Sequence, residues 1–247
     1  RLTDSYCDPP GLTDSLHTER LSRLPGIYMS WRPPTDAPAV NALPALSSGR
    51  VTFGSFNSCF KITPSMIEVW SQVLHAVSDS RLVLFTVTGE RATQRLCDAF
   101  ALQGVAPERV EVRARISHEE FLAAHREIDI ALDTFPYHGT TTTCFSLWMG
   151  VPVVTLAGAV HVSRVGVTLL NAIGLPELVA TSSAHYVQIA SDLASDANAL
   201  AHLRAELRGL ILNSPLVDGR ACARNLESAF KSMWRTWCSA RAPGMDE

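Results

Sequence analysis

The sequence has no long hydrophobic run and no excess of basic residues. No apolar stretch approaches the roughly 20 residues that a membrane-spanning helix needs. Lys and Arg number 21 and Asp and Glu number 24, which gives a formal net charge of −3. Because nucleic-acid binding depends on a basic surface, we expect neither a membrane nor a nucleic acid as partner.

Cysteine pairs and a dinucleotide fingerprint are also missing. The six cysteines are scattered, and no two form a C-x-x-C pair. We therefore expect no metal site and no disulfide framework, and we expect a reducing, cytoplasmic location. There is no G-x-G-x-x-G, so a dinucleotide cofactor is not indicated. The chain starts at Arg1 without a methionine or a signal-like segment, and we interpret it as a fragment.

What the chain does have is enough apolar sequence for a packed core. Its 247 residues are 47% hydrophobic, which suits one large or two small domains. Residues 1–49 show little periodicity, although Ser15 to Leu24 could form a short helix. Nearly fifty such residues are too many for an ordinary loop in a compact domain. We interpret residues 1–49 as a linker that lies across a neighbouring domain.

From Val51 onward, strand patterns alternate with helix patterns. Thr63-Pro64 is a typical helix start, and Ser117-x-x-Glu120 is a capping box. The predicted strands are 51–56, 81–87, 110–112, 130–132, 153–156 and 178–179. The predicted helices begin at 63, 91, 117, 140 and 163, and three more follow at about 184–193, 197–212 and 218–237. This alternation predicts a Rossmann-like α/β domain over residues 50–238 with helices at its C-terminal end, and a tail at 239–247.

The most informative stretch runs from Asp129 to Thr155, and four threonines open its helix. The first N–H groups of a helix lack partners and carry the positive end of the dipole, which suits a phosphate. Gly139 would let the backbone approach such a group, and the hydroxyls of Thr140, Thr141 and Thr142 could donate to it. The alternative is a plain N-cap threonine.

Three loops follow predicted strands at the same edge of the sheet: residues 57–61, 114–120 and 135–143. Ligands of open α/β sheets bind outside the carboxyl ends of the strands. We therefore expect these loops to line one pocket.

Several segments together resemble the C-terminal catalytic lobe of the protein O-GlcNAc transferase family, which includes the Spindly-type protein O-fucosyltransferases. The central segments are FGSFN at 53–57, KITP at 61–64, LDTFPY at 132–137, GTTTTC at 139–144, LWMGVPVVT at 147–155 and SRVG at 163–166. With RLTD at 1–4, DPPG at 8–11, RLP at 23–25, SPL at 214–216, LE at 226–227 and MW at 233–234, the resemblance spans nearly the whole chain.

The resemblance implies a GT-B glycosyltransferase, with two Rossmann-like lobes and a metal-independent site between them. It implies a nucleotide-sugar donor and protein Ser/Thr acceptors. It also implies tetratricopeptide repeats, which are not in this chain, ahead of an N-terminal lobe of which the chain would hold only the end. Residues 1–49 would then be the end of the N-terminal lobe and the interlobe linker.

The resemblance also assigns residues. Lys61 matches the family lysine at the diphosphate and is our catalytic candidate. Further donor-binding candidates are Ser58, Ile116, His118, Gly139, Thr140, Thr141 and Thr142. Lys61 could instead be a solvated surface lysine, and His118 an exposed residue in the first turn of a helix. His138 and His161 could each be catalytic, and each could equally be a loop histidine with a local hydrogen bond.

Two positions depart from the family pattern. Phe121 replaces a histidine close to the donor, and Phe145 replaces the acid that binds the ribose hydroxyls. Three functions therefore remain open: transfer of GlcNAc from UDP-GlcNAc to protein Ser/Thr, transfer of fucose from GDP-fucose, and a degenerate nucleotide-binding or non-catalytic interaction module.

Overall fold

A parallel sheet of six strands forms the centre of the computed structural model, which describes residues 1–86, 89–114 and 117–241. The strand order is β5-β4-β3-β6-β7-β8, and every neighbouring pair is parallel. The strands are β3 (Thr52–Ser55), β4 (Arg81–Phe85), β5 (Val110–Arg113), β6 (Ile130–Leu132), β7 (Val153–Leu156) and β8 (Val179–Ala180). The predicted Rossmann-like α/β fold is confirmed, although Val87, the predicted end of the second strand, lies outside the described residues.

The chain order of the strands reverses in the middle of the sheet. From β3 the chain builds outward through β4 and β5, then returns to place β6 on the other side of β3. In such sheets the crevice at the carboxyl ends of the two strands that flank the reversal is the usual ligand site. Here that crevice lies between the loop after β3 and the loop after β6.

The inner strands are apolar along their length because helices cover both faces of the sheet. Leu82, Val83 and Leu84 of β4 are fully buried. Burial on both faces removes the polar–apolar alternation of a half-exposed strand, so continuous apolar runs are expected.

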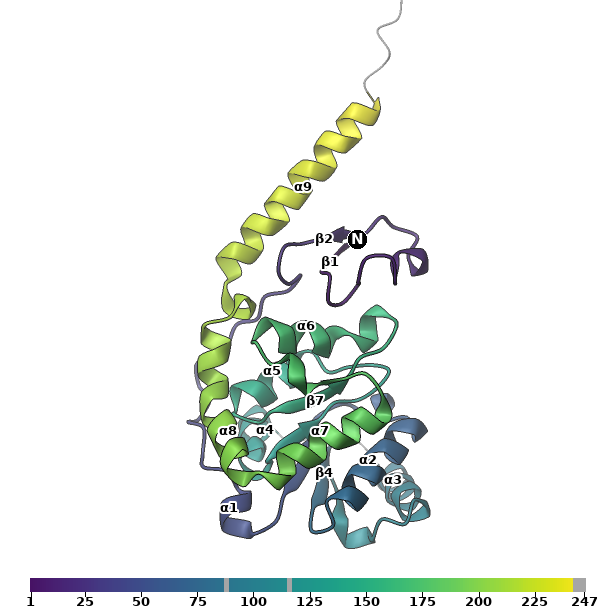
Figure 1. The fold of residues 1–247 in the computed structure, drawn as a ribbon, viewed down its shortest axis with the longest axis vertical. Coiled ribbons are helices and arrows are strands. Elements are labelled where there is room, and N and C mark those ends of the chain that lie inside the picture. The colour runs from purple at the N-terminus through teal and green to yellow at the C-terminus, as the bar shows by residue number, and fades with distance from the viewer. Residues whose placement is uncertain (87–88, 115–116, 242–247) are drawn as a thin grey trace, which may run out of the picture.

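Helices cover the sheet on both sides. Helix α2 lies beside α7, and α5 lies beside α6 and α8 (Figure 1). The helices are α1 (Ala45–Ser48), α2 (Pro64–Ala76), α3 (Glu90–Leu102), α4 (His118–Ala124), α5 (Thr141–Trp148), α6 (Val165–Ala172), α7 (Ser183–Ser195), α8 (Ala197–Leu212) and α9 (Gly219–Arg241).

Local capping signals placed two helix starts correctly. Thr63 accepts a hydrogen bond from the Met66 N–H at the start of α2. Ser117 and Glu120 form the predicted capping box of α4. That helix ends at Ala124 and continues as a 3₁₀ turn, η4 (His125–Glu127), so the predicted helix end near residue 126 was close.

The prediction of a helix over residues 15–24 is wrong. The structure has a 3₁₀ turn, η1 (Asp14–Leu16), followed by an extended segment in which β2 (Ser22–Arg23) pairs in parallel with β1 (Leu2–Thr3). The N–H groups of Ser22 and Leu24 donate to the carbonyls of Arg1 and Thr3, at 2.8 and 2.7 Å. Tertiary pairing therefore overrides a weak helical preference.

The N-terminal segment is fastened to the sheet lobe. The Asp4 carboxylate accepts hydrogen bonds from the Thr168 hydroxyl on α6, at 3.0 Å, and from the Tyr28 N–H, at 3.1 Å. The Trp31 N–H donates to the Leu216 carbonyl at 2.8 Å. That residues 1–49 are the end of another lobe and a linker stays a prediction.

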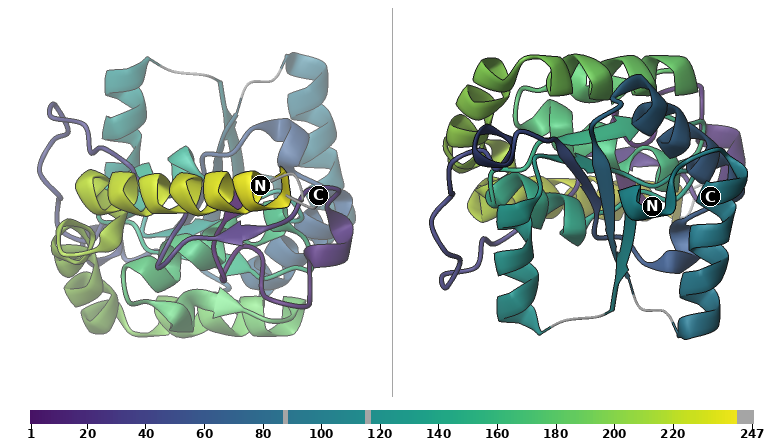
Figure 2. Two further views of the ribbon diagram at one scale, coloured as in Figure 1. Left: turned by 90° about the horizontal axis from the view of Figure 1, so that it is seen from above. Right: turned by 90° about the horizontal axis from the view of Figure 1, so that it is seen from below.

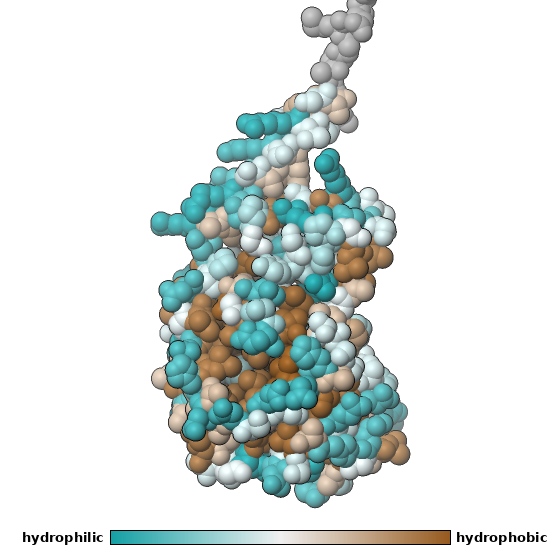
Figure 3. Space-filling view, viewed as in Figure 1, coloured by the Kyte–Doolittle hydropathy of each residue, from teal (hydrophilic) through white to brown (hydrophobic). Residues whose placement is uncertain are grey.

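Helix α9 extends four residues beyond its predicted end and projects from the lobe (Figure 1). Seen from above, it crosses over the N-terminal segment (Figure 2). Figure 3, seen from the same side as Figure 1, shows hydrophobic residues gathered over the sheet-containing lobe. Phe230 and Trp234 of α9 are exposed at 57% and 62%, so this helix buries little of its apolar surface against the described residues.

Candidate functional site

A buried carboxylate organises the crevice at the strand reversal. Asp133 directly follows β6, and its Oδ1 accepts hydrogen bonds from the Gly139 N–H at 2.8 Å and the Asn57 amide at 3.1 Å. Its Oδ2 accepts from the Thr155 hydroxyl at 2.9 Å. One side chain thus joins the loops after β3 and β6 to β7. A carboxylate with several donors is well suited to hold a buried loop in one conformation.

Asn57 carries this network to the threonine-rich helix. Its side-chain oxygen accepts a hydrogen bond from the Thr142 hydroxyl at 3.0 Å. A small cavity lined by both residues has room for about one water molecule. The Thr142 hydroxyl is therefore used within the protein, while Thr141 above it is exposed.

Gly139 is required by space rather than by its backbone angle. A Cβ at this position would lie 2.5 Å from the Thr142 hydroxyl oxygen, 2.7 Å from that of Thr143 and 2.9 Å from the Asn57 side-chain oxygen. Any larger residue would push these groups apart. The space around this glycine is thus filled by its own neighbours, and the approach of its backbone to a phosphate stays a prediction.

The start of α5 is open. Thr140 is the N-cap residue, but its side chain makes no capping hydrogen bond. Thr140 therefore occupies the N-cap position, but its hydroxyl does not cap the helix as the alternative interpretation requires. Thr141 is the first residue of the helix and is exposed, and Thr140 is half-buried. The first helical N–H groups have no partner within the helix and lie at the positive end of its dipole.

Lys61 extends from the loop after β3 toward the start of α5. The corner is the name used below for this region, formed by Lys61, Asn57, Asp133 and the loop that leads into α5. Its ammonium donates to the His138 carbonyl at 2.8 Å, two residues before Thr140, and lies 3.9 Å from the centroid of the Tyr137 ring. Partial burial lowers the pKa of Lys61, and the negative charge of Asp133 opposes that shift. Lys61 is therefore a held, half-buried cation and not a freely solvated one.

His138 is a structural residue of the loop. It is fully buried, its Nε2–H donates to the Leu156 carbonyl at 2.9 Å, and its Nδ1 accepts from the Gly166 N–H at 3.0 Å. Burial lowers the pKa of His138, so the ring is neutral. His161 also has a partner, the Asp8 carboxylate at 2.7 Å. The partners of the two histidines lie 18, 28 and 153 residues away in the sequence, so both are hydrogen-bonded as predicted, but through long-range and not local contacts.

The other candidates are more scattered. Ser58 is exposed and precedes the 3₁₀ turn η2 (Cys59–Lys61), so it lies beside Lys61 in the chain. His118 is exposed at the first position of α4, and its ring meets Phe145 edge-on at a centroid distance of 5.7 Å. Ile116 lies outside the described residues.

Phe121 and Phe145 belong to one aromatic cluster. Their ring centroids are 5.4 Å apart, and Phe121 also contacts Phe56 at 5.4 Å. Phe56 in turn stacks on His125, with centroids 3.8 Å apart. Burial lowers the pKa of His125 to about 3, so this ring is neutral. The two positions expected to depart from the family pattern thus hold packed apolar rings, of which Phe145 lies on α5 itself.

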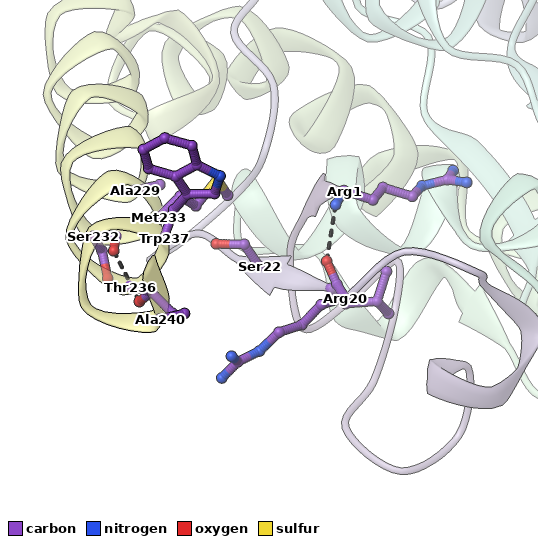
Figure 4. Close-up of a pocket in the computed structure, with 10 residues that line it drawn as sticks. Arg1, Arg20, Ser22, Ala229, Ser232, Met233, Thr236, Trp237 and Ala240 are labelled. Carbon is purple, nitrogen blue, oxygen red and sulfur yellow. Dashed lines mark hydrogen bonds between the residues drawn. The ribbon is translucent and has the colours of Figure 1, made fainter. Parts of the chain in front are cut away.

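A larger groove of about 500 Å³ lies elsewhere, between α9 and the N-terminal segment. Figure 4 shows Met233 and Trp237 of α9 facing it, with Arg1 and Arg20 on the other side and the Arg1 amino group bonded to the Arg20 carbonyl at 2.8 Å. It is remote from the strand reversal, so its size does not make it the candidate site.

Within the described ranges, no three His, Cys, Asp or Glu side chains gather where they could hold a metal ion. The helices of those ranges include none that is both long and apolar enough to cross a bilayer.

Comparison with known proteins identifies the family of the chain. Residues 40–226 match the model of Glycosyl transferase family 41. The chain belongs to glycosyl transferase family 41. The resemblance inferred from the sequence motifs is thereby confirmed.

Relatives in family 41 are similar over most or all of the chain. A rice protein (Oryza sativa subsp. japonica) named "Probable UDP-N-acetylglucosamine--peptide N-acetylglucosaminyltransferase SPINDLY" is 46% identical over 250 residues, 99% of this chain and 27% of that protein. A Caenorhabditis elegans UDP-N-acetylglucosamine--peptide N-acetylglucosaminyltransferase is 33% identical over 78% of this chain and 17% of its own length. The chain thus spans about a quarter of the curated relative from rice.

Solved structures agree on the architecture. An O-GlcNAc transferase of Thermobaculum terrenum, solved as a point mutant, superposes with a TM-score of 0.89 at 37% identity, over 98% of this chain and 46% of that one. Staphylococcus aureus TarM superposes with a TM-score of 0.61 at 9% identity, over 93% of this chain and 43% of that one, which shows the fold alone. The family 41 chain therefore has the α/β architecture of a GT-B lobe, as predicted.

Sequence reasoning missed three residues of the corner. Asp133, Asn57 and Tyr137 were part of the motifs that carried the resemblance, but none was singled out. The available signal was position, because Asp133 directly follows β6 and Asn57 closely follows β3. Polar residues directly after buried strands are expected at the ligand edge of such a sheet.

Proposed function

We propose that this chain is the donor-binding half of a protein glycosyltransferase that transfers GlcNAc from UDP-GlcNAc to Ser and Thr hydroxyls of proteins. The observation that carries the proposal is the meeting of the Lys61 ammonium with the loop that opens α5, at the strand reversal. The names of the family 41 relatives from rice and Caenorhabditis elegans support the donor and the class of acceptor.

The chemistry asks for stabilisation of a leaving diphosphate. Negative charge grows on its oxygens as the bond to the sugar breaks, and fixed cations and backbone dipoles stabilise that charge without reorganising. Lys61 supplies the cation, and Thr140, Thr141 and Thr142 stand where the helix presents its unpaired N–H groups. In this proposal Ser58, Gly139, Ile116 and His118 complete the donor site, with no metal required.

We also propose a division of labour within a longer protein. An N-terminal lobe would close the site and tetratricopeptide repeats would select acceptors, consistent with relatives about four times as long as the matched part. A cytoplasmic location is proposed as well, supported by the absence of disulfide bonds in the described residues.

Calorimetry on the full-length protein tests the donor, with UDP-GlcNAc and GDP-fucose titrated in parallel. We expect UDP-GlcNAc to bind more tightly. Lys61→Met should weaken binding by about 10- to 100-fold, because a hydrogen bond to a charged group contributes roughly 1.5–3 kcal/mol. The matched control is Lys231→Met, which removes the chain's other lysine from the exposed face of α9.

Each other result selects an alternative. Tighter binding of GDP-fucose would make the protein an O-fucosyltransferase. Binding of neither nucleotide sugar would make it a non-catalytic module, and Phe121→His with Phe145→Asp should then restore binding, because these changes return hydrogen-bonding groups to the aromatic cluster.

A further inference from the structure

Tyr137 lies at the solvent-exposed side of the corner, beside Lys61. Packing of the core does not require a tyrosine at this position. Its side chain is 52% exposed, so it contributes little to the core. One face of its ring is nevertheless covered by the Lys61 ammonium, with Nζ 3.9 Å from the ring centroid. An ammonium centred over an aromatic face is attracted by the negative charge density of the ring.

The peptide group that follows Tyr137 is held at both its carbonyl and its N–H, so the ring starts from a defined position. The Thr134 hydroxyl donates to the Tyr137 carbonyl at 2.6 Å. The next residue, His138, is fully buried, and its N–H donates to the Val162 carbonyl at 3.0 Å. The loop therefore presents the Tyr137 ring from a rigid base.

Lys61 needs such a partner. Its side chain has four rotatable carbons, and its ammonium has three N–H donors. The His138 carbonyl takes one donor at 2.8 Å, and the ring faces the ammonium from a second direction. A third donor remains for an anion. Without the ring, a single carbonyl would hold the ammonium, and the long side chain would sample solvent.

We propose that Tyr137 is a positioning residue for Lys61, whose ring holds the ammonium where it meets the diphosphate of the donor. The inference rests on the proposed function, since it assigns Tyr137 to the same site. It is specific to the ring face and does not involve the phenol oxygen. Phenylalanine should therefore serve as well as tyrosine, and an aliphatic residue should not.

The test is calorimetry of UDP and GDP binding to the full-length protein and to its Tyr137→Phe and Tyr137→Leu variants. Whichever diphosphate binds the wild type is followed. We expect Tyr137→Leu to weaken binding by about 2- to 5-fold, the range for a partly exposed cation–π contact, and Tyr137→Phe to retain it. Tyr6→Leu, at another partly exposed tyrosine, is the control and should change nothing.

A double-mutant cycle separates positioning through Lys61 from a general effect on the loop. On a Lys61→Met background, Tyr137→Leu should have no further effect, because the ring then has no cation to hold. If the two changes are additive, if Tyr137→Phe is as weak as Tyr137→Leu, or if Tyr137→Leu binds as well as or better than wild type, the positioning role is overturned.

Failure of the inference and failure of the proposed function give different results. If Lys61→Met loses affinity and Tyr137→Leu does not, the diphosphate corner stands and only the role of Tyr137 falls. If neither UDP nor GDP binds the wild type, or Lys61→Met binds as well as wild type, both fall together.

Discussion

Individual hydrogen bonds of the Asp133 and Asn57 side chains hold the loops of the corner in place. The Asp133 carboxylate binds the Gly139 N–H and the Asn57 amide, and the Asn57 oxygen binds the Thr142 hydroxyl. Asn57 uses its side-chain nitrogen for Asp133 and its side-chain oxygen for Thr142, so the loops after β3 and β6 are fixed relative to α5 before any ligand arrives. Such preorganisation means that a bound diphosphate need not order the loop itself.

Gly139→Ala should therefore damage the corner. The new methyl group would lie 2.5–2.9 Å from three oxygens, and overpacking of this kind costs about 1–3 kcal/mol. We expect urea unfolding to show that loss and calorimetry to show weaker binding of the donor diphosphate. Gly209→Ala is the matched control, since nothing lies within 4 Å of a Cβ there. In that exposed helical position alanine should stabilise by roughly 0.5–1 kcal/mol. Equal effects at the two glycines would contradict the steric argument.

His125 makes the stability of the lobe depend on pH. Burial holds its folded-state pKa at about 3, against 6.5 for an unperturbed histidine. Below pH 6.5 the unfolded chain takes up a proton that the folded chain refuses, so stability falls as the pH is lowered from 6.5 toward 3. The contribution between pH 6.5 and pH 5 is about 2 kcal/mol.

Urea unfolding at pH 7 and at pH 5 measures this dependence. His125→Gln should lose less stability than wild type over that interval, by about 2 kcal/mol. His202→Gln, at an exposed histidine on α8, should keep the wild-type difference. A wild-type slope in His125→Gln would assign the acid sensitivity to other groups, with buried His138 the first to examine because burial lowers its pKa in the same direction.

At the scale of elements, capping residues in the sequence correctly predicted where two helices begin, because a helix cap involves only residues close together in the chain. The Thr63 cap of α2 and the Ser117 capping box of α4 involve residues three apart, and both are present. The parallel sheet followed from the alternation of strand and helix patterns. The helix proposed for residues 15–24 failed because β2 pairs with β1, about twenty residues away. The hydrogen bond between Asn57 and Asp133 spans 76 residues. Their positions after two strands indicate a shared edge of the sheet, but not that the two side chains pair.

Arg204 on α8 also makes hydrogen bonds between segments that are far apart in the sequence. It is 1% exposed, and its guanidinium donates to the Ile128 carbonyl at 2.8 Å and to the Asn41 side chain at 2.7 Å. It thereby ties the segment before α1 and the start of β6 to α8. Burial lowers the pKa of Arg204 to about 10, so it remains a cation at neutral pH.

Arg204→Leu should leave these acceptors unpaired and lower the free energy of unfolding by about 2–4 kcal/mol, measured in urea. Arg204→Lys should not restore the stability, because one ammonium cannot reach all the acceptors that the planar guanidinium of Arg204 reaches together. Arg95→Leu, at an exposed position on α3, is the control and should change stability by less than about 0.5 kcal/mol. A small loss at Arg204 would mean that water or rearranged side chains satisfy the carbonyls.

At the scale of the whole molecule, the corner is one wall of a site. Ser58, Thr141 and His118 are all exposed, so the described residues leave the region open to solvent. Electrostatic stabilisation is strongest where water is excluded, which an open wall does not achieve. The chain also spans only 27% of the rice relative. A second wall from elsewhere in a longer protein would close the site.

We therefore expect the 247-residue chain alone to bind donor but not to transfer sugar. Within the described residues of the corner, Asp133 is buried and saturated with donors, His138 has both ring nitrogens engaged, and Lys61 is a cation. None of the three is placed to take a proton from an acceptor hydroxyl, a step that general-base catalysis accelerates by about 10²–10⁴-fold. Mass spectrometry of Ser/Thr peptides incubated with UDP-GlcNAc or GDP-fucose should show transfer by the full-length protein only. Comparable transfer by the isolated chain would place the missing base among its own residues.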